Sequence, residues 1–432
     1  MKYLRRITLP AILFLTGTLL AQQTPAPEQT TPITIVGATA HIGNGEVIEN
    51  SVITFADGKI TSVTQGDMTS PEGTVIDAKG MHVYPGFIAP NTSLGLVEID
   101  AVEETVDEDE IGELLPHVRS IIAYNAESQV VESMRPNGVL IAQVVPRGGR
   151  ISGTSSIVQL DAWNWEDAVL QENDGLHINW PQSYRQGRWW RGEDPGIKPN
   201  EDYVKEVDEL ISFFKNAKAY LAGNRDEVHL PFEAMETVFQ GEKKVFIHAD
   251  GEKEIIDILD FKKEQGLQNV VLVGAYDAFK VSDEIKAAGV PVLIGRVHDQ
   301  PEMEDQDYDL PYKMARLLSD KGILVGLETS GDMERMNTRN LPFYAGTAVA
   351  FGVDKEEALK MITSNTAKIL GIDERMGTLE AGKDATLFIS NGDALDMRTN
   401  KISRAFIQGR DISLESHQTE LAERYSEKYD NQ

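Results

Sequence analysis

Three side chains with acid–base chemistry follow predicted β-strands in the second half of the chain. His248 lies at the end of the apolar strand 244–249, and Glu328 and Asp332 follow the strand 323–327. An imidazole with an unperturbed pKa of about 6.5 suits general acid or base catalysis, and nearby carboxyl groups can take part in the same proton transfers. We therefore assign His248, Glu328 and Asp332 as candidate catalytic residues. The alternative for His248 is a structural histidine, hydrogen-bonded at a strand end without a reaction to run.

A loop rich in glycine, arginine and hydroxyl side chains follows another predicted strand, 139–145. It reads PRGGRISGT over residues 146–154. Backbone amides in such a loop form anion-binding concavities, so Arg150 is a candidate for binding an anionic or carboxylate group of a substrate. The alternative is a tight turn without a ligand.

The elements that position these side chains alternate between strands and helices. Further apolar runs lie at 270–273 and 290–294, and helical patterns lie at 282–288, 310–319 and 355–370. Asp354 and Glu357 are typical of a capping box at the start of the last helix. This rhythm indicates βα units and a parallel sheet, and over residues 84–375 it predicts an α/β fold of the TIM-type (β/α)8 barrel class. A doubly wound sheet is the alternative, but no Gly-rich phosphate loop follows the first strand.

Short alternating strands occupy both ends of the chain. They are predicted at 33–36, 51–55, 59–63, 74–77, 385–389 and 405–407. Asp57-Gly58 between the second and third strands predicts a type I′ hairpin. We expect residues 33–83 and 376–412 to form one small composite β-sandwich, followed by a helical tail at 413–432.

The first 21 residues have the pattern of a secretory signal peptide. Lys2, Arg5 and Arg6 form a basic region before an apolar stretch at 7–20, which is too short to span a bilayer comfortably. A flexible leader is expected at 22–32. The sequence therefore predicts a periplasmic or secreted protein that is not membrane-bound once the signal is cleaved.

Composition narrows the partners and the basis of stability. The net charge of −28 disfavours nucleic acids and anionic membrane surfaces, because both would repel it. Cysteine is absent, so an exported fold must rely on its core rather than on disulfides.

Three segments resemble amidohydrolases of the imidazolonepropionase-like branch. Residues 80–88 read GMHVYPGFI, which is similar to the approach to the first barrel strand. Residues 365–371 (NTAKILG) and 376–385 (MGTLEAGKDA) resemble the C-terminal signature of the family. The resemblance covers nearly all of the chain after the leader. It implies hydrolysis of an amide or cyclic amide C–N bond at the carboxyl ends of the barrel strands.

The positions that hold a divalent metal in this family carry other residues here. The resemblance implies His-x-His after residue 88, but Asn91 and Ser93 stand there. His248 matches the strand-five histidine. Tyr276 lies where a second histidine is expected, and Ser330 takes the place of the strand-eight aspartate. We therefore predict no metal ligands and assign Asn91, Ser93, Tyr276 and Ser330, with Arg150, to substrate binding.

Two classes of function stay open at this point. One is a C–N hydrolase with a metal-free mechanism or with a single weakly held divalent ion such as Zn²⁺ near His248. The other is a non-catalytic barrel, a pseudoenzyme, that binds a small molecule or pairs with an active homologous amidohydrolase. Homo-oligomer formation is compatible with either class.

Overall fold

The fold is described from a computed structural model. It covers residues 24–67, 72–187, 192, 194, 196–225, 227–301, 306–331 and 334–430. The predicted signal peptide and the candidate Asp332 lie outside these residues. Within the described part, no helix combines the length and the apolar character needed to cross a membrane.

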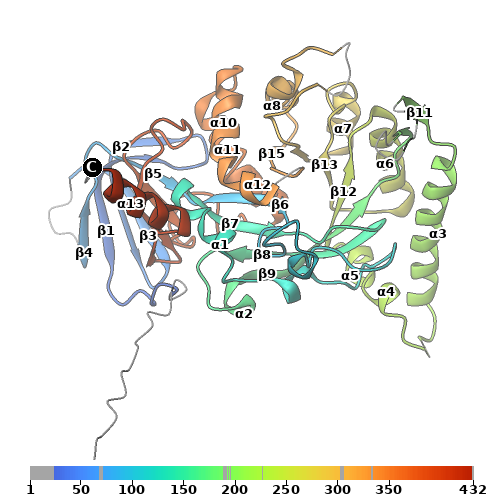
Figure 1. Cartoon of the computed structure of the whole chain (residues 1–432), viewed down its shortest axis with the longest axis horizontal. Coiled ribbons are helices and arrows are strands. Elements are labelled where there is room, and N and C mark those ends of the chain that lie inside the picture. The colour runs from blue at the N-terminus through green and yellow to red at the C-terminus, as the bar shows by residue number, and fades with distance from the viewer. Residues whose placement is uncertain are drawn as a thin grey trace, which may run out of the picture.

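One sheet joins both ends of the chain. Its strands are β1 (Ile33–His41), β2 (Val47–Ala56), β3 (Lys59–Gln65), β4 (Thr74–Asp77), β5 (His82–Pro85), β16 (Leu387–Ser390), β17 (Ile402–Ile407) and β18 (Arg410–Ile412). The two ends meet where β5 pairs with β16, and blue and brown-red strands lie together in Figure 1. The predicted sandwich of two stacked sheets is not confirmed, because the described strands form one hydrogen-bonded sheet.

The predicted hairpin between β2 and β3 is confirmed. Asp57 and Gly58 have φ values of 51° and 75°, the left-handed pair that a type I′ turn requires. Between the strands of this sheet lies a core separate from that of the barrel, in which Phe55 and Phe406 from opposite ends of the chain pack edge to face at 5.1 Å.

A second eight-stranded sheet forms the barrel. It contains β6 (Phe87–Thr92), β7 (Val139–Val144), β8 (Ile151–Gln159), β9 (Val169–Asn179), β12 (Lys244–Ala249), β13 (Val270–Gly274), β14 (Val292–Ile294) and β15 (Val325–Leu327). A separate two-stranded ribbon joins β10 (Tyr184–Gln186) and β11 (Ile197–Pro199). The strands β12 to β15 are parallel, so their carboxyl ends meet at one edge.

The described helices complete the chain. They are α1 (Gln129–Glu132), α2 (Trp165–Ala168), α3 (Tyr203–Leu221), α4 (Leu230–Glu233), α5 (Glu236–Phe239), α6 (Glu252–Gln265), α7 (Ser282–Ala288), α8 (Leu310–Asp320), α9 (Glu334–Asn337), α10 (Leu341–Ala350), α11 (Lys355–Lys360), α12 (Ser364–Leu370) and α13 (His417–Asp430). In Figure 1, α3, α6, α7 and α8 lie outside the barrel strands, whereas α13 lies by the end sheet.

The barrel departs from an all-parallel sheet at β8. This strand is antiparallel to both β7 and β9. The loop between β7 and β8 covers only residues 145–150, whereas a parallel connection needs a crossover of a dozen or more residues. The hairpin places residues 145–150 at the barrel mouth and turns the strand back through the interior.

The single helix predicted at 355–370 is wrong, because the structure breaks it into α11 and α12. Asp354 caps α11 as predicted, since its side chain accepts hydrogen bonds from the amides of Glu356 and Glu357. At the break, two backbone carbonyls accept hydrogen bonds from β6 and β15, the two strands at the ends of the barrel sheet. The amide of Leu327 donates to the carbonyl of Met361 at 3.1 Å, and the amide of Ile88 donates to that of Ile362 at 3.0 Å.

A buried charge cluster ties the end sheet to the barrel. Asp161, just after β8, accepts a hydrogen bond from Arg135 at 2.9 Å and another from Arg410 of β18 at 2.9 Å. The three side chains are at most 8% exposed. Each arginine therefore depends on the same carboxylate for compensation of its charge.

We predict that Asp161→Asn lowers the free energy of unfolding by about 3–5 kcal/mol, because it removes the carboxylate that two buried guanidinium groups share. Urea unfolding followed by circular dichroism measures the change. Asp396→Asn, at the exposed ion pair with Arg398, is the control and should leave the midpoint unchanged. Equal midpoints for both variants would contradict the role assigned to Asp161.

Candidate functional site

A cavity of about 1320 Å³ opens at the carboxyl ends of β12 to β15. Its lining includes His248 near the end of β12, Tyr276 after β13, Gly295 after β14, and Glu328 and Ser330 after β15. Parallel strands deliver these residues to one edge, which is where barrel enzymes place their chemistry. The site is therefore a pocket built by strand ends.

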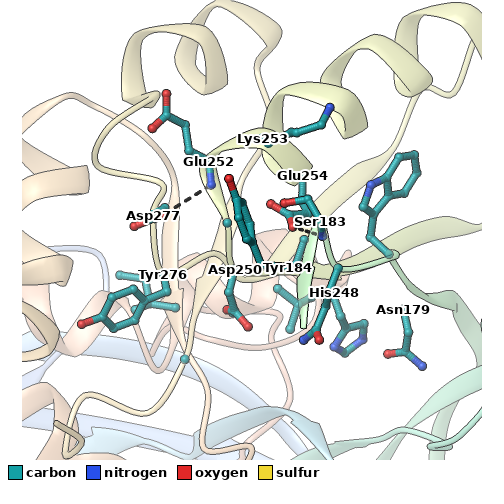
Figure 2. A pocket seen from close by; sticks show the side chains of 18 of the residues that line it. Asn179, Ser183, Tyr184, His248, Asp250, Glu252, Lys253, Glu254, Tyr276 and Asp277 are labelled. Atoms are coloured by element: carbon teal, nitrogen blue, oxygen red, sulfur yellow. Dashed lines mark hydrogen bonds between the residues drawn. The ribbon is translucent and has the colours of Figure 1, made fainter. Parts of the chain in front are cut away.

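His248 and Asn179 form one wall of the cavity. They are register partners on the neighbouring strands β12 and β9, and Figure 2 shows both side chains at the base of the pocket. Loss of hydration and, to a smaller extent, the positive charge of Arg147 together lower the pKa of His248 to about 3. The imidazole is therefore neutral at physiological pH.

Glu328 is 1% exposed and lies on the opposite side of the strand edge. Its carboxylate accepts hydrogen bonds from the backbone amide of Ser330 at 2.6 Å, the hydroxyl of Ser330 at 2.7 Å and the side-chain amide of Asn91 at 3.2 Å. Burial nevertheless raises the pKa of Glu328 to about 7, against the two bonds from Ser330 that favour the carboxylate. Glu328 thus titrates near neutral pH.

An arginine on the β7–β8 hairpin connects the end of β6 to α9. Arg147 donates to the side-chain oxygen of Asn91 at 2.8 Å and to its backbone carbonyl at 3.0 Å. It also pairs with both carboxylate oxygens of Glu334, at 2.8 and 3.0 Å. Ser93 donates its amide and its hydroxyl to the same carboxylate, at 2.9 and 2.6 Å. These four residues form a closed polar network.

Asn91 can take this position because of its backbone. Its φ is 51°, a left-handed conformation that asparagine adopts more readily than most residues. Its amide donates to the side chain of Gln143 at 3.1 Å, which fixes the residue from below.

A second polar chain runs from His248 into the barrel core. His248 Nε2 lies 3.0 Å from His177 Nδ1, and His177 Nε2 lies 2.9 Å from Ser155 Oγ. Ser155 donates to Asp174 at 2.8 Å. His177, Ser155 and Asp174 are at most 3% exposed, and His177 stacks on Phe246 with 4.7 Å between ring centres. The histidine at the cavity is thus anchored by a buried chain.

Comparisons with known proteins place this geometry in a family. Residues 196–412 match the model of the amidohydrolase family, which is half of the chain. The chain belongs to the amidohydrolase family.

The most similar relatives share its imidazolonepropionase-like branch. The chain is 24% identical over 391 residues to an imidazolonepropionase of Thermoanaerobacter pseudethanolicus, covering 82% of this chain and 86% of the relative. An imidazolonepropionase of Caldanaerobacter subterraneus is 25% identical over 394 residues, covering 81% of this chain and 86% of the relative. The predicted membership of this branch is confirmed.

Solved structures show the same fold. An amidohydrolase from Thermotoga maritima superposes with a TM-score of 0.77 at 23% identity, covering 88% of this chain and 99% of that one. A Xaa-Pro dipeptidase with bound methionine gives a TM-score of 0.54 at 15% identity, covering 88% and 100%. At these identities the likeness supports the barrel fold alone.

Amidohydrolases usually hold a divalent metal at this edge, and the donor set of this chain does not fit one. The side chain of Asn91 is hydrogen-bonded to Arg147, and that of Ser93 is hydrogen-bonded to Glu334. Nε2 of His248 is hydrogen-bonded to His177. Within the described ranges, no group of three or more His, Asp or Glu side chains is arranged to bind a metal ion. The guanidinium group of Arg147 connects the end of β6 to α9 instead.

The predicted site residues divide between the cavity and the network beneath it. His248, Glu328, Tyr276 and Ser330 line the cavity, whereas Asn91 and Ser93 are fully buried under it. Arg150 contacts the carbonyl of Asn179 at 3.0 Å and lies beside the cavity lining rather than in it. Their roles in binding or catalysis stay predictions.

Several amides of the loop 146–154 are bonded within the protein. The amide of Arg147 donates to the carbonyl of Glu108, and the amides of Arg150 and Ile151 donate to the carbonyl of Glu113. The acidic segment before this loop therefore takes up three of the donors that the sequence suggested for a ligand.

Sequence reasoning missed Arg147, Glu334, Asn179 and His177. Arg147 and Arg150 are equivalent on sequence, and only the hairpin geometry distinguishes them. The alternation of β9 was a usable signal for the last two, because His177 and Asn179 are two residues apart and so share one face.

We predict that the pH dependence of stability exposes the raised pKa of Glu328. The folded state holds the proton to about pH 7, against 4.5 for a free carboxyl, so this stability is present below about pH 4.5 and is lost as pH rises through about 7. The free energy of unfolding of wild type relative to Glu328→Gln should fall by about 3 kcal/mol over that window.

Urea unfolding at several pH values measures this difference. Glu172→Gln, which removes a half-exposed carboxylate on β9, is the matched control and should give a nearly constant difference. A constant difference for Glu328→Gln as well would mean that the carboxyl titrates normally.

Proposed function

We propose that the barrel mouth binds a small polar molecule of the amide type without a metal-activated water. The observation that carries this proposal is the complete internal use of Asn91 and Ser93. The amide and side-chain atoms of both residues are bonded to Gln143, Arg147, Glu328 or Glu334. If Asn91 and Ser93 bound a metal, they would have to break these buried hydrogen bonds. This cost supports a site without the metal centre.

The cavity has the size and the polarity of a small-molecule site. Its volume of about 1320 Å³ exceeds that of an ordinary ligand pocket. Seven carboxyl side chains line it, against two cationic ones, Lys253 and Arg296. Lys253 is paired with Asp257 at 2.7 Å, and Arg296 lies 3.6 Å from Asp299. The excess of acid favours a neutral or cationic ligand over an anion.

Family membership supports a second candidate, the hydrolysis of a carbon–nitrogen bond without a metal. The observation that favours it is the separation of two pKa values at one cavity: about 7 for Glu328 and about 3 for His248. Such a separation assigns acid and base roles to neighbouring groups. The water oxygen would bond to the carbonyl carbon, and the C–N bond would break as Glu328 gives its proton to the leaving nitrogen. The proton lost by the water would return to the Glu328 carboxylate, and the neutral His248 would orient the water by accepting a hydrogen bond from it.

Export and partner choice are further parts of the proposal. The basic and apolar pattern of residues 1–21 supports secretion to the periplasm or the medium. Pairing with an active homologous amidohydrolase would give a binding barrel a biological role.

We predict that cyclic ureides, which are neutral, or dipeptides, which are zwitterions, raise the melting temperature of the wild type, whereas N-acyl amino acids, which are anions, have little effect. A ligand at a hundred times its Kd adds about 2.7 kcal/mol to the folded state. Gly295→Leu is the matched variant, because a Cβ there meets its nearest neighbour at an ordinary 3.5 Å. It should project a leucine side chain into the cavity beside Glu328 with little loss of stability, and it should abolish the shift. A panel without any effect, or a shift that survives in Gly295→Leu, would contradict binding in this cavity.

The same panel separates the two candidates. Release of free amine, measured with a chelator present, would support metal-free hydrolysis, and Glu328→Gln should then abolish turnover but not binding. Binding without product supports the binding protein.

A further inference from the structure

We infer that Asp174, acting through Ser155 and His177, fixes which ring nitrogen of His248 carries the hydrogen, so that the cavity meets a hydrogen-bond acceptor. This inference deepens the proposed function, because it states what a ligand must present to this wall. It rests on the count of hydrogens in a buried chain whose members have few alternatives.

The count starts at Asp174, which is 3% exposed. One of its oxygens accepts from Gln143 at 2.7 Å and the other accepts from Ser155 at 2.8 Å. A serine hydroxyl has one hydrogen, and an ionised carboxylate can only accept. Ser155 therefore donates its hydrogen to Asp174 at 2.8 Å, with the carbonyl of Gly175 as a more distant acceptor at 3.2 Å. Both groups can only accept, so Ser155 offers lone pairs alone to His177.

The next members of the chain follow by necessity. His177 Nε2, 2.9 Å from Ser155 Oγ, must donate, so His177 Nδ1 has no hydrogen. His248 Nε2, 3.0 Å from that nitrogen, must donate in turn. A neutral imidazole has only one N–H, so Nδ1 of His248 is a bare acceptor. Within the described residues, Nδ1 has no hydrogen-bond partner.

Asn179 adds a second acceptor beside His248. Its side-chain NH₂ faces the carbonyl of Gly149 at 2.8 Å, the hydroxyl of Ser152 at 3.0 Å and the carbonyl of Gly148 at 3.3 Å. Two carbonyls can only accept, which fixes the amide orientation and leaves the side-chain oxygen for other partners. Both residues line the cavity on neighbouring strands. This wall therefore suits a ligand that presents N–H donors, as an unsubstituted amide or ureide does.

The ionisation of Asp174 decides the direction of the chain. Burial raises the pKa of Asp174 to about 6, against hydrogen bonds from Ser155 and Gln143 that lower it. The carboxylate is therefore ionised at about pH 8. An asparagine in its place would donate to Ser155, and the hydroxyl would then donate to His177 Nε2 at 2.9 Å in preference to the carbonyl of Gly175 at 3.2 Å. This reversal would put the hydrogen of His248 on Nδ1. Asp174→Asn thus converts the acceptor into a donor without touching the cavity.

The test is nitrogen NMR of protein labelled with ¹⁵N-histidine at about pH 8. His248→Gln and His177→Gln identify the two rings. The expected wild-type spectrum has hydrogen on Nε2 and none on Nδ1 of His248, and Asp174→Asn should exchange these two states. Glu172→Gln on the same strand should keep the wild-type pattern. A hydrogen on Nδ1 in the wild type, or an unchanged ring in Asp174→Asn, would overturn the inference.

Two further arms protect the test. If Asp174→Asn does not fold, Ser155→Ala replaces it, because it removes the acceptor that holds His177 in its tautomer and should also move hydrogen to Nδ1 of His248. Hydantoin and 1,3-dimethylhydantoin probe the ligand requirement, and only the first should bind. Failure of both to bind would count against the proposed function, whereas the nitrogen spectra decide the inference independently.

Discussion

The ion pair between Arg147 and Glu334 is the interaction on which the barrel mouth depends. It joins the β7–β8 hairpin to α9, and it takes up the side chains of Asn91 and Ser93 at the end of β6. Glu334 is 8% exposed and Arg147 is 22% exposed. Water therefore reaches each charge only in part, and each would lose its main compensation if the other were removed. A guanidinium group donates in fixed directions and stays charged at all relevant pH values. The network is therefore permanent and directional.

This fixed charge shapes the groups around it. The positive field of Arg147 adds to the loss of hydration that keeps His248 neutral. It also opposes the burial that raises the pKa of Glu328. His248 has one ring nitrogen bonded to His177 and a lowered pKa, so it is better suited to hydrogen bonding than to proton transfer. The positive charge of Arg147 thus makes the carboxyl edge of the barrel strands a poor site for a divalent ion. Together with burial, the same charge keeps His248 neutral and able to bind a polar ligand.

The sequence predicted the frame of the molecule better than its site. Strand patterns located the barrel, and Asp57-Gly58 predicted the β2–β3 hairpin of the end sheet because a type I′ turn has a strong local signature. The antiparallel β8 was missed although the six residues 145–150 are too few for a crossover. The break after α11 was not foreseeable, because it serves hydrogen bonds to β6 and β15 that are remote in sequence.

At the site, the sequence showed which metal-ligand positions of the family carry other residues. It did not show which side chains those residues contact. Asn91 and Ser93 were recognisable as non-ligands. Their partners Arg147 and Glu334 lie on segments that meet them only in the folded barrel. His177 was similarly hidden, because its role follows from the pairing of β9 with β12 rather than from any motif.

The central claim is that the Arg147 network takes the place of a metal centre. Equilibrium dialysis of the purified protein against Zn²⁺, followed by elemental analysis, tests it most directly. The account predicts no binuclear occupancy, with at most one weakly held ion that a brief exchange into metal-free buffer removes. Two ions per chain that survive this exchange would contradict it, because they would require Asn91 to give up its hydrogen bonds with Arg147 and Ser93 to give up those with Glu334.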